Sequence, residues 1–333
     1  MRKLRFGVLG TAKIAREKVI PPLQRAARCE VAAIASRDAA VARELANRLD
    51  IARAHGSYEE LLADPDIDAV YIPLPNHLHL PWTIRAAEAG KHVLCEKPIG
   101  LDAAEVDRLI EVRDRTGVRL QEVFMVRTHP QWLRARDLVQ GGRIGVLQAI
   151  AGHFSYHLTD PSNIRNVAAW GGGGLLDIGW YPITTSRFVT GREPRRVAAL
   201  IDRDPAMGVD RLGSVLLDFD GVQGSFTYAT QMVPRQTMQF LGSKARLEVE
   251  IPFNAPGDRP CRVLVYDGAG LGLAVTEAIE LPVCDQYGVL ADAFAASIQD
   301  GAPQPVPLED SLANMRVIDA VLRAAERGTW EAP

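Results

Sequence analysis

The sequence predicts an α/β protein in which an N-terminal doubly wound parallel sheet precedes a C-terminal α+β domain with a large, open, mainly antiparallel sheet. In the first third of the chain, short apolar runs of strand length alternate with helical patterns, as in repeated βαβ units. Further along, longer segments alternate apolar and polar residues, which is typical of half-exposed strands. The length of 333 residues suits two domains better than one hydrophobic core.

The first domain is expected over residues 1–123, and several of its helix ends can be read from single residues. Ser57 and Asp102 are expected N-caps, of helices that begin at Tyr58 and Ala103, and Gly90 is the expected C-cap of the helix between them. The helices separate six candidate strands, which are 4–9, 31–35, a weak one at 53–55, 69–72, 92–95 and 119–123.

The second domain is expected over residues 124–333. A Pro- and Gly-rich stretch at 252–260 is interpreted as a connecting loop. Residues 310–327 form an amphipathic pattern, predicted to be a final helix that is able to pack back on the first domain. The candidate strands of this domain are 146–156, 211–219, 224–230, 246–250 and 262–266.

Composition and charge exclude several classes of protein. A formal net charge of -3 gives no basic surface for a phosphate backbone or an anionic membrane, so we expect no nucleic acid and no membrane partner. No apolar run is long enough to span a bilayer or to act as a signal peptide. The four cysteines, Cys29, Cys95, Cys261 and Cys284, have no paired spacing and are interpreted as thiols in the cytoplasm.

A candidate phosphate-binding turn directly follows the first strand and opens a helix. A dinucleotide fold needs a glycine for the tight turn, a small residue where the backbone approaches the pyrophosphate, and another where helix meets strand. Gly10, Ala12 and Ala15 match these roles, although Ala12 replaces the usual second glycine. The alternative is a packed turn in an α/β domain that binds no nucleotide. In the Rossmann interpretation, the contacts to the cofactor come from Gly10, Thr11, Ala12, Lys13 and Ile14.

The end of the second strand favours NADP over NAD. NAD enzymes usually place an acidic side chain there for the ribose 2′-hydroxyl, whereas a 2′-phosphate is better bound by a hydroxyl and a guanidinium. Ser36 and Arg37 stand at this position. In the alternative interpretation, Arg37 is solvated at a helix start and Asp38 is the N-cap of that helix.

The ends of the fourth and fifth strands carry the next candidate contacts. Ligands of doubly wound sheets bind beyond the carboxyl ends of the strands, so both segments are expected to face the cofactor. We expect no metal at His77 and His79, because no third ligand is evident nearby; loop packing is their alternative role. The expected cofactor contacts here are Leu74, Pro75, Asn76, His77, His79, Glu96 and Lys97.

The sequence Glu96-Lys97-Pro98 resembles the hallmark of the glucose-fructose oxidoreductase / inositol dehydrogenase (Gfo/Idh/MocA) family, and the resemblance extends over essentially the whole chain. Residues 121–131 are similar to the family's entry into its catalytic domain. Residues 172–181 are similar to its second signature, in which Asp177 precedes Tyr181 by four residues. The inositol dehydrogenase branch has histidine at the last position.

With residues 160–165, the chain most resembles the branch of NADP-dependent D-xylose 1-dehydrogenases, aldose-aldose oxidoreductases and dihydrodiol dehydrogenases. The resemblance implies NADP-linked oxidation of a sugar or polyol. Alternatives are the reverse reduction of a ketosugar or dicarbonyl, and an NADP-binding sensor without catalysis. It also implies a homodimer or homotetramer through the open sheet, whose exposed face is costly to leave in water.

Oxidation of a hydroxyl needs a base for its proton while the nicotinamide takes the hydride. Tyr181 is the candidate acid/base. Lys97 is predicted to stabilise its anion and to hydrogen-bond the substrate oxygen, and Asp177 to orient Lys97 or a substrate hydroxyl. Asp177 and Tyr181 would share one helix face, since they are four residues apart. Alternatively, Tyr181 packs in the core and Lys97 is a surface lysine. By resemblance alone, Asn163, Arg165 and His129 are candidate substrate contacts and Arg127 a cofactor contact.

Overall fold

A computed structural model describes residues 2–268 and 274–333 of the chain. It divides into two compact units, which are described separately here. The first unit contains residues 1–128 and 285–312, and the second contains 129–284 and 313–333. In the part of the chain that the structure describes, no helix is both long and apolar enough to cross a membrane.

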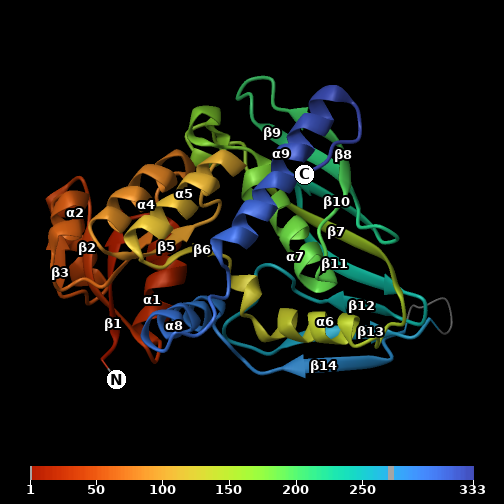
Figure 1. Ribbon diagram of the computed structural model, residues 1–333, viewed down its shortest axis with the longest axis horizontal. Coiled ribbons are helices and arrows are strands. Elements are labelled where there is room, and N and C mark those ends of the chain that lie inside the picture. Colours follow the sequence, from red (N-terminus) through yellow and green to blue (C-terminus); the bar gives the residue numbers. More distant parts are fainter. Residues whose placement is uncertain (1, 269–273) are drawn as a thin grey trace. The chain divides into compact units, whose positions relative to one another are not determined.

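The first unit is built on a six-stranded parallel sheet in the order β3-β2-β1-β4-β5-β6 (Figure 1). This order reverses direction between β1 and β4, as in a dinucleotide-binding fold. All six strands predicted from the sequence are present. Their bounds are β1 Leu4–Leu9, β2 Cys29–Ala35, β3 Arg53–His55, β4 Ala69–Ile72, β5 His92–Glu96 and β6 Leu120–Val123.

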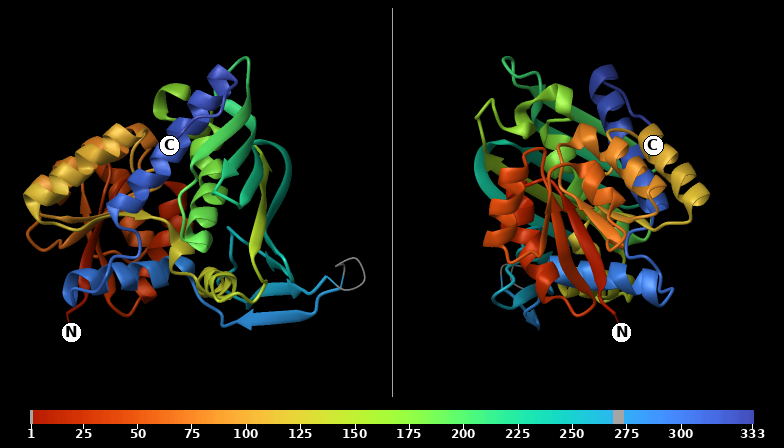
Figure 2. Two further views of the ribbon diagram at one scale, coloured as in Figure 1. Left: turned by 45° about the vertical axis from the view of Figure 1, so that its right-hand side comes forward. Right: turned by 90° about the vertical axis from the view of Figure 1, so that its left-hand side faces the viewer.

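Helices cover both faces of this sheet (Figure 2, right). Helix α4 packs on α5, and α1 packs on α8. The predicted N-caps are confirmed, because the side chains of Ser57 and Asp102 accept hydrogen bonds from Glu60 N and Glu105 N. The helices are α1 Ile20–Arg25, α2 Ala39–Arg48, α3 Tyr58–Ala63, α4 His79–Glu88, α5 Ala103–Thr116 and α8 Gln286–Gln299, with short turns of helix at Ala15–Val19, Asn76–Leu78 and Met125–Arg127.

The units differ from the predicted domain boundary after residue 123. Residues 124–128 and 285–312 belong with the first sheet. Helix α8 buries Phe294 completely, with its ring centroid 6.3 Å from that of Phe6 in β1. Burying a phenylalanine contributes about 1.5–3 kcal/mol, which gives α8 a reason to join this unit. Helix α9, Leu308–Arg327, starts in the first unit and belongs to the second from Ala313 onward.

The second unit is built on an eight-stranded sheet in the order β14-β13-β12-β11-β7-β10-β9-β8. The sheet is mixed, since β10 runs parallel to β7 while the other neighbours are antiparallel. Helices α6 Pro130–Gln140 and α7 Trp180–Thr190 pack on each other. The strands are β7 Leu147–His157, β8 Arg196–Arg203, β9 Asp210–Asp218, β10 Gln223–Ala229, β11 Gln231–Gly242, β12 Arg246–Val249, β13 Cys261–Tyr266 and β14 Glu277–Leu281.

Three strands of this sheet, β8, β11 and β14, were not among the predicted segments. Strand β11 contains Pro234, which lacks the N–H that a central strand normally uses. Its pairing with β7 is irregular between Gln231 and Arg235, so the proline lies where the ladder is interrupted. Strand β14 is largely exposed and shows no apolar alternation. Neither strand therefore had a clear pattern in the sequence.

An aromatic cluster fills the core between α6, α7 and the sheet. Trp132 stacks on Phe253 with ring centroids 6.2 Å apart, and its indole N–H donates to Pro252 O over 2.7 Å. Phe253 also stacks on Phe154, with centroids 4.9 Å apart. The segment that holds Pro252 and Phe253 is the predicted loop, and its aromatic residue anchors it to the core.

Candidate functional site

The first candidate feature is the turn after β1. Gly10 has φ +102°, a conformation that favours glycine, and its N–H donates to Ala35 O at the end of β2 over 2.9 Å. A Cβ on Gly10 would lie 3.0 Å from Leu74 Cδ2. Glycine is therefore required by both the dihedral angle and the space, and the turn is fixed against the neighbouring strand.

A continuous helical stretch from residue 13 to 25 follows this turn. Thr11, Ala12 and Ile14 are half-buried, and the exposed Lys13 lies 3.9 Å from Glu17. The first turn of a helix leaves backbone N–H groups without intrahelical acceptors, and such groups suit a phosphate. This end of the sheet therefore fits the pyrophosphate of a dinucleotide.

At the end of β2, the structure separates the roles of three neighbouring side chains. Asp38 caps α2 by accepting from Ala40 N over 2.8 Å, and Ser36 Oγ accepts from Asp38 N over 3.2 Å. Arg37 is exposed. Burial raises the pKa of Tyr58, while the nearby guanidinium of Arg37 lowers it. The carboxylate of Asp38 is thus engaged by α2, whereas the guanidinium of Arg37 is exposed near Tyr58.

The end of β5 presents Glu96 and Lys97, both half-buried, with a cis bond between Lys97 and Pro98. The hydroxyl of the fully buried Tyr71 in β4 donates to Glu96 Oε1 over 2.7 Å. Two adjacent strands therefore hold the residue before Lys97. The sequence analysis missed Tyr71, whose place inside an apolar strand carries no sign of this contact.

His79 was expected to contact the cofactor, and the structure corrects this. Its ring is 1 % exposed, with Nδ1 2.7 Å from Pro98 O and Nε2 2.6 Å from Leu74 O. Burial lowers the pKa of His79 to about 4, whereas the two carbonyl acceptors raise it. Neither ring nitrogen is available to a cofactor. His77, Asn76 and Pro75 remain half-buried in the loop after β4.

Glu122 in β6 is a buried carboxyl that the sequence analysis did not single out. It is 1 % exposed and accepts from Ile99 N over 2.9 Å and from Ser311 Oγ over 2.8 Å. Burial raises its pKa to about 8, and the nearby charge of Lys97 acts in the opposite direction. Lys97 is therefore close to a second ionisable group of the same unit.

Arg127 and His129, which were predicted to contact the cofactor and the substrate, each contact another residue of the protein. Arg127 forms an ion pair with Asp310, with 3.1 Å between Nη1 and Oδ2. His129 is buried, and its Nδ1 accepts from Gln131 N over 3.3 Å at the start of α6. Burial lowers the pKa of His129 to about 4. Nδ1 of His129 thus caps α6, whereas its buried Nε2 has no hydrogen-bond partner among the described residues, so the contact of His129 with the substrate stays a prediction.

In the second unit, Asp177 is the centre of a polar network. Its Oδ2 accepts from Tyr156 OH over 2.6 Å and from Arg165 Nε over 3.0 Å. The carboxylate of Asp177 is the main cause that raises the pKa of Arg165, and the hydroxyls of Tyr156 and Tyr181 add to it. Burial, followed by the charge of Asp177, raises the pKa of Tyr156. Asp177 thus holds Arg165 and Tyr156, and its predicted role of orienting Lys97 or a substrate hydroxyl stays a prediction.

The glycine run before Asp177 explains how this network is assembled. Gly173 has φ +133°, and a Cβ there would lie 2.0 Å from Asp210 Oδ1. Its N–H donates to Arg165 O over 2.9 Å, and the buried Asp210 accepts from Leu175 N. The close approach of three segments requires glycine. It places the backbone of Arg165 beside the turn of helix that carries Asp177.

Asp177 and Tyr181 were expected on one α-helix, but the structure differs. Residues Leu175–Gly179 form a π-helical turn, and α7 begins at Trp180. Since this turn is wider than an α-helical one, the two side chains do not follow α-helical spacing. Tyr181 is 7 % exposed, and its ring packs on Phe154 and Phe253, with centroids 5.6 Å and 5.2 Å away. Tyr181 is thus packed in the core and also lies near Arg165.

Asn163 lies at the start of the short helix Ile164–Asn166, where its Oδ1 accepts from Arg165 N over 3.1 Å. Asn166 Nδ2 donates to Asp160 O over 2.7 Å. These bonds order the loop from which Arg165 reaches Asp177. The structure therefore brings together Asn163, Arg165, Asp177 and Tyr181 of the predicted site.

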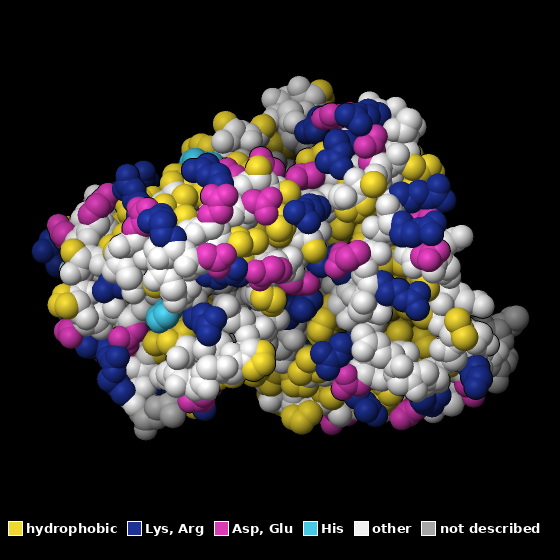
Figure 3. All heavy atoms as spheres, viewed as in Figure 1, with side chains coloured by type: hydrophobic (Ala, Val, Ile, Leu, Met, Phe, Trp, Pro, Cys, Tyr) yellow, Lys and Arg dark blue, Asp and Glu magenta, His cyan; other side chains and the backbone are white. Residues whose placement is uncertain are grey.

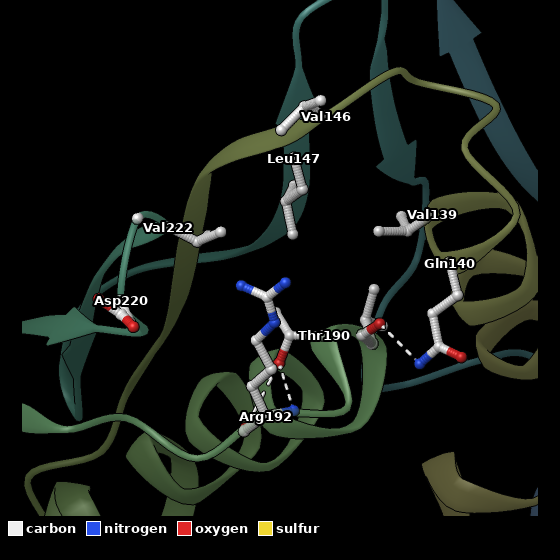
Figure 4. Close-up of a pocket in the computed structure, with 10 residues that line it drawn as sticks. Val139, Gln140, Val146, Leu147, Thr190, Arg192, Asp220 and Val222 are labelled. Carbon is white, nitrogen blue, oxygen red and sulfur yellow. Dashed lines mark hydrogen bonds between the residues drawn. The ribbon is translucent and has the colours of Figure 1, made fainter.

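A cavity of about 490 Å³ lies at the other end of α7, beside Val189 and Thr190. Figure 4 shows Val139, Val146 and Leu147 around it, with the guanidinium of Arg192 turned toward Leu147. None of the predicted catalytic residues lines it, because Tyr181 lies in the first turn of α7, Asp177 in the π-helical turn before it, and Lys97 after β5. On the face in view in Figure 3, basic and acidic side chains are interspersed over α4 and α5.

Comparison with known proteins matches two family models. The model described as the Gfo/Idh/MocA oxidoreductase family with an NAD-binding Rossmann fold matches residues 4–124. The model of the Gfo/Idh/MocA C-terminal domain matches residues 132–248. The two matches lie in different units, in chain order.

Three relatives extend over nearly the whole chain. An uncharacterised oxidoreductase from Rhizobium meliloti is 50% identical and covers 99% of both chains. A D-xylose 1-dehydrogenase (NADP+) from Haloferax volcanii is 40% identical and covers 97% of this chain and 98% of its own. A dTDP-3,4-didehydro-2,6-dideoxy-α-D-glucose 3-reductase from Streptomyces violaceoruber is 36% identical and covers 98% of this chain and 96% of its own.

Solved structures agree with this similarity. A 3-ketoreductase from Actinomadura kijaniata, in complex with NADP and TDP-benzene, has a TM-score of 0.89 at 34% identity, covering 97% of this chain and 98% of its own. An aldose-aldose oxidoreductase from Caulobacter crescentus, complexed with glycerol, has a TM-score of 0.91 at 28% identity over 100% of both chains.

Proposed function

The chain belongs to the Gfo/Idh/MocA family of oxidoreductases, and on that premise we propose that it is an NADP-dependent sugar dehydrogenase that oxidises C1 of an aldose to a lactone. The xylose dehydrogenase relative supports this direction and this cofactor. The observation that carries the proposal is the network in which Asp177 holds Arg165 near Tyr181.

The residues of the first unit fit NADP. The glycine turn at Gly10 leaves the following helix start open to the pyrophosphate, and Arg37 with Ser36 suits a 2′-phosphate better than a bare ribose. Asp38, the one acid of that segment, is engaged by α2. When bound, NADP supplies the hydride acceptor. The remaining candidate contacts around it are the backbone at 11–14, the loop at 74–77, Glu96 and Lys97.

Tyr181 is the proposed acid/base. A free tyrosine has a pKa of about 10, so its phenolate is scarce at neutral pH unless a cation stabilises it. Arg165 is such a cation, since its charge and that of a Tyr181 phenolate interact. Tyr181 would take the proton from the C1 hydroxyl while C1 loses its hydride. Asp177 would keep Arg165 in place through the 3.0 Å bond to Nε.

Lys97 belongs to the first unit and Tyr181 to the second. We propose that both act on the same substrate oxygen, with the ammonium of Lys97 donating to it as its charge changes. Arg165 and Asn163 are proposed to contact the other sugar hydroxyls. A structure with NADP and sugar bound would test this, because Lys97 and Tyr181 must both lie within hydrogen-bond distance of one substrate oxygen.

A second candidate is the reverse reaction, the NADPH-dependent reduction of a ketosugar. The reductase relative from Streptomyces violaceoruber, at 36% identity, favours it. The same residues serve either direction, since Tyr181 then donates the proton that it would otherwise accept. Oxidation of a trans-dihydrodiol is a third possibility within this chemistry, and an NADP-binding sensor is the alternative from another class.

The test is to incubate the purified protein with NADP and a panel of aldoses, polyols and dihydrodiols, and with NADPH and ketosugars, while following NADPH absorbance. Aldose-dependent formation of NADPH and a lactone product supports the proposal. Activity only with NADPH and ketosugars supports the reductase. Tight NADP binding without turnover of any substrate supports the sensor.

The open sheet of the second unit is the proposed subunit interface. Along β9, Val215 and Leu217 are 1 % exposed, whereas Leu212 and Leu216 on the opposite face are 36 % and 49 % exposed. Leu200 in the neighbouring β8 is 79 % exposed. Exposed apolar side chains on one face are typical of a protein contact. We propose a homodimer or homotetramer through this face, working in the cytoplasm.

A further inference from the structure

One peptide group directly after Lys97 is held at both ends by buried side chains. The group joins Pro98 to Ile99. His79 Nδ1 lies 2.7 Å from its carbonyl oxygen, and its N–H donates to Glu122 Oε1 over 2.9 Å. Both side chains are 1 % exposed. The backbone that follows Lys97 therefore has contacts to two polar side chains from different elements.

Each of these side chains has a second contact that fixes it. His79 Nε2 lies 2.6 Å from Leu74 O, in the loop after β4. Glu122 Oε2 accepts from Ser311 Oγ, at the start of α9, over 2.8 Å. The peptide group is thus connected to the loop after β4 on one side and to α9 on the other.

Both side chains that contact this peptide group are ionisable and buried. Burial raises the pKa of Glu122 and lowers the pKa of His79, so each charged form is disfavoured. Apolar residues at these two positions would leave the buried carbonyl of Pro98 and N–H of Ile99 without these partners. The charge of Lys97 interacts with both side chains. The polar groups therefore surround the residue on which the proposed chemistry depends.

We propose that His79 and Glu122 are positioning residues that fix the Pro98–Ile99 peptide and thereby hold the ammonium of Lys97 where it meets the substrate oxygen. This inference rests on the proposed role of Lys97. The long side chain of Lys97 extends from this backbone, so a shift of the backbone also moves the ammonium group. A displacement of about 1 Å at a reacting centre can cost about 100-fold in rate.

The test compares two substitutions of Glu122. Glu122→Gln removes the ionisable carboxyl but keeps an oxygen that accepts from Ile99 N, whereas Glu122→Leu removes both the carboxyl and that oxygen. The difference between the two variants reports the hydrogen bond, because both lack the charge. Glu111→Gln is the matched control, since it makes the same change at an exposed carboxylate of α5 in the same unit.

The position of Lys97 can be followed without a substrate. The chain has six lysines, at positions 3, 13, 18, 91, 97 and 244, so ¹³C-dimethylation gives few NMR signals, and Lys97→Arg assigns the one of interest. We expect the chemical shift of the Lys97 signal to differ between Glu122→Leu and Glu122→Gln, with and without NADPH, while Glu111→Gln resembles wild type.

With a turned-over sugar, kcat of Glu122→Leu should fall about 10- to 100-fold below that of Glu122→Gln, with little change in the Kd of NADPH. His79→Leu should behave like Glu122→Leu. If it does not fold, His79→Gln, which keeps one donor, should give an intermediate kcat. Equal kcat and equal Lys97 signals in Glu122→Gln and Glu122→Leu would overturn the inference.

The failure of this inference differs from the failure of the proposed function. If wild-type protein turns over no sugar while the Lys97 signal still distinguishes Glu122→Leu from Glu122→Gln, the positioning role stands and the assigned reaction is wrong. If sugars are turned over and the Lys97 signal is the same in both variants, the reaction stands and the positioning role is wrong.

Discussion

Arg165 Nε lies 3.0 Å from Asp177 Oδ2, and this ion pair joins a loop to the π-helical turn that precedes α7. The Asp177 side chain is 14% exposed and that of Arg165 is 42% exposed. Water therefore reaches the guanidinium while the carboxylate stays protected. Such a pair can hold a cation at the edge of a site, where a substrate is able to reach it.

The two hydrogen bonds that Asp177 Oδ2 accepts should differ in their effect on turnover. Asp177→Asn removes the charge that holds Arg165, so we expect kcat to fall at least about tenfold, as for a group that supports general acid/base catalysis. Tyr156→Phe removes only the 2.6 Å bond to the same oxygen and should cost less. Steady-state kinetics on both variants would check this; wild-type kcat in Asp177→Asn would contradict it.

The proposed catalytic groups predict a loss of turnover without a loss of cofactor. Lys97→Met and Tyr181→Phe should each lower kcat about 10²- to 10⁴-fold, the usual effect of removing an acid/base group, while the Kd of NADP changes little in Tyr181→Phe. Lys244→Met, at an exposed lysine of the second unit, is the control. A variant that keeps wild-type turnover would remove its residue from the mechanism.

Selection of the 2′-phosphate by Arg37 predicts a cofactor-specific effect. A hydrogen bond to a charged group contributes about 1.5–3 kcal/mol, so Arg37→Ala should weaken NADP binding about 10- to 100-fold and leave NAD binding nearly unchanged. Arg43→Ala, at another exposed arginine of α2, is the control. Titration calorimetry with both cofactors gives the ratio, and equal losses for NADP and NAD would refute the assignment.

The buried carboxyl of Glu122 predicts a pH dependence of stability. Burial raises its pKa from 4.5 to about 8 in the folded chain. Between these values the folded state holds a proton that the unfolded state has lost, so the free energy of unfolding falls as pH rises from about 4.5 to about 8. Glu122→Gln lacks this proton. Its stability relative to wild type should therefore increase over this range, as measured by urea unfolding at several pH values; parallel curves would contradict the prediction.

The proposed subunit interface predicts dissociation by a charge on the open sheet. Leu216→Glu places a carboxylate among exposed apolar side chains, and light scattering should detect a smaller particle at equal concentration. Val41→Glu is the control, because Val41 is 40 % exposed on α2, outside this sheet. An unchanged mass for Leu216→Glu would move the interface elsewhere.

Local patterns were sufficient for the first sheet. Its strands are short apolar runs buried on both faces, and its helices begin at side chains such as Ser57 and Asp102 that cap by bonds three residues away. The second sheet was predicted in part. Strand β11 includes a proline at an irregular pairing and β14 is exposed, so neither shows the alternation by which strands are recognised.

The residues of the candidate site also fall into two groups, those whose place the sequence could predict and those whose contacts depend on burial. Gly10, Arg37 and Lys97 follow strands whose ends the sequence marks, so their place at one edge of the sheet could be predicted. His79 was expected to contact the cofactor, but it is buried and both of its ring nitrogens lie against backbone carbonyl oxygens. A histidine that contacts a ligand and one that binds a carbonyl look the same in a sequence, because burial decides between them.

The sequence by itself determined the order of strands and helices in the first sheet, the glycine turn and the expectation of NADP, since these depend on neighbours a few positions apart. Only the tertiary structure decided that Asp177 holds Arg165, that Glu122 and His79 hold the peptide after Lys97, and that residues 285–312 return to the first unit. These contacts join residues far apart in the chain. They depend on burial and on hydrogen-bond geometry, which exist only once the chain is folded.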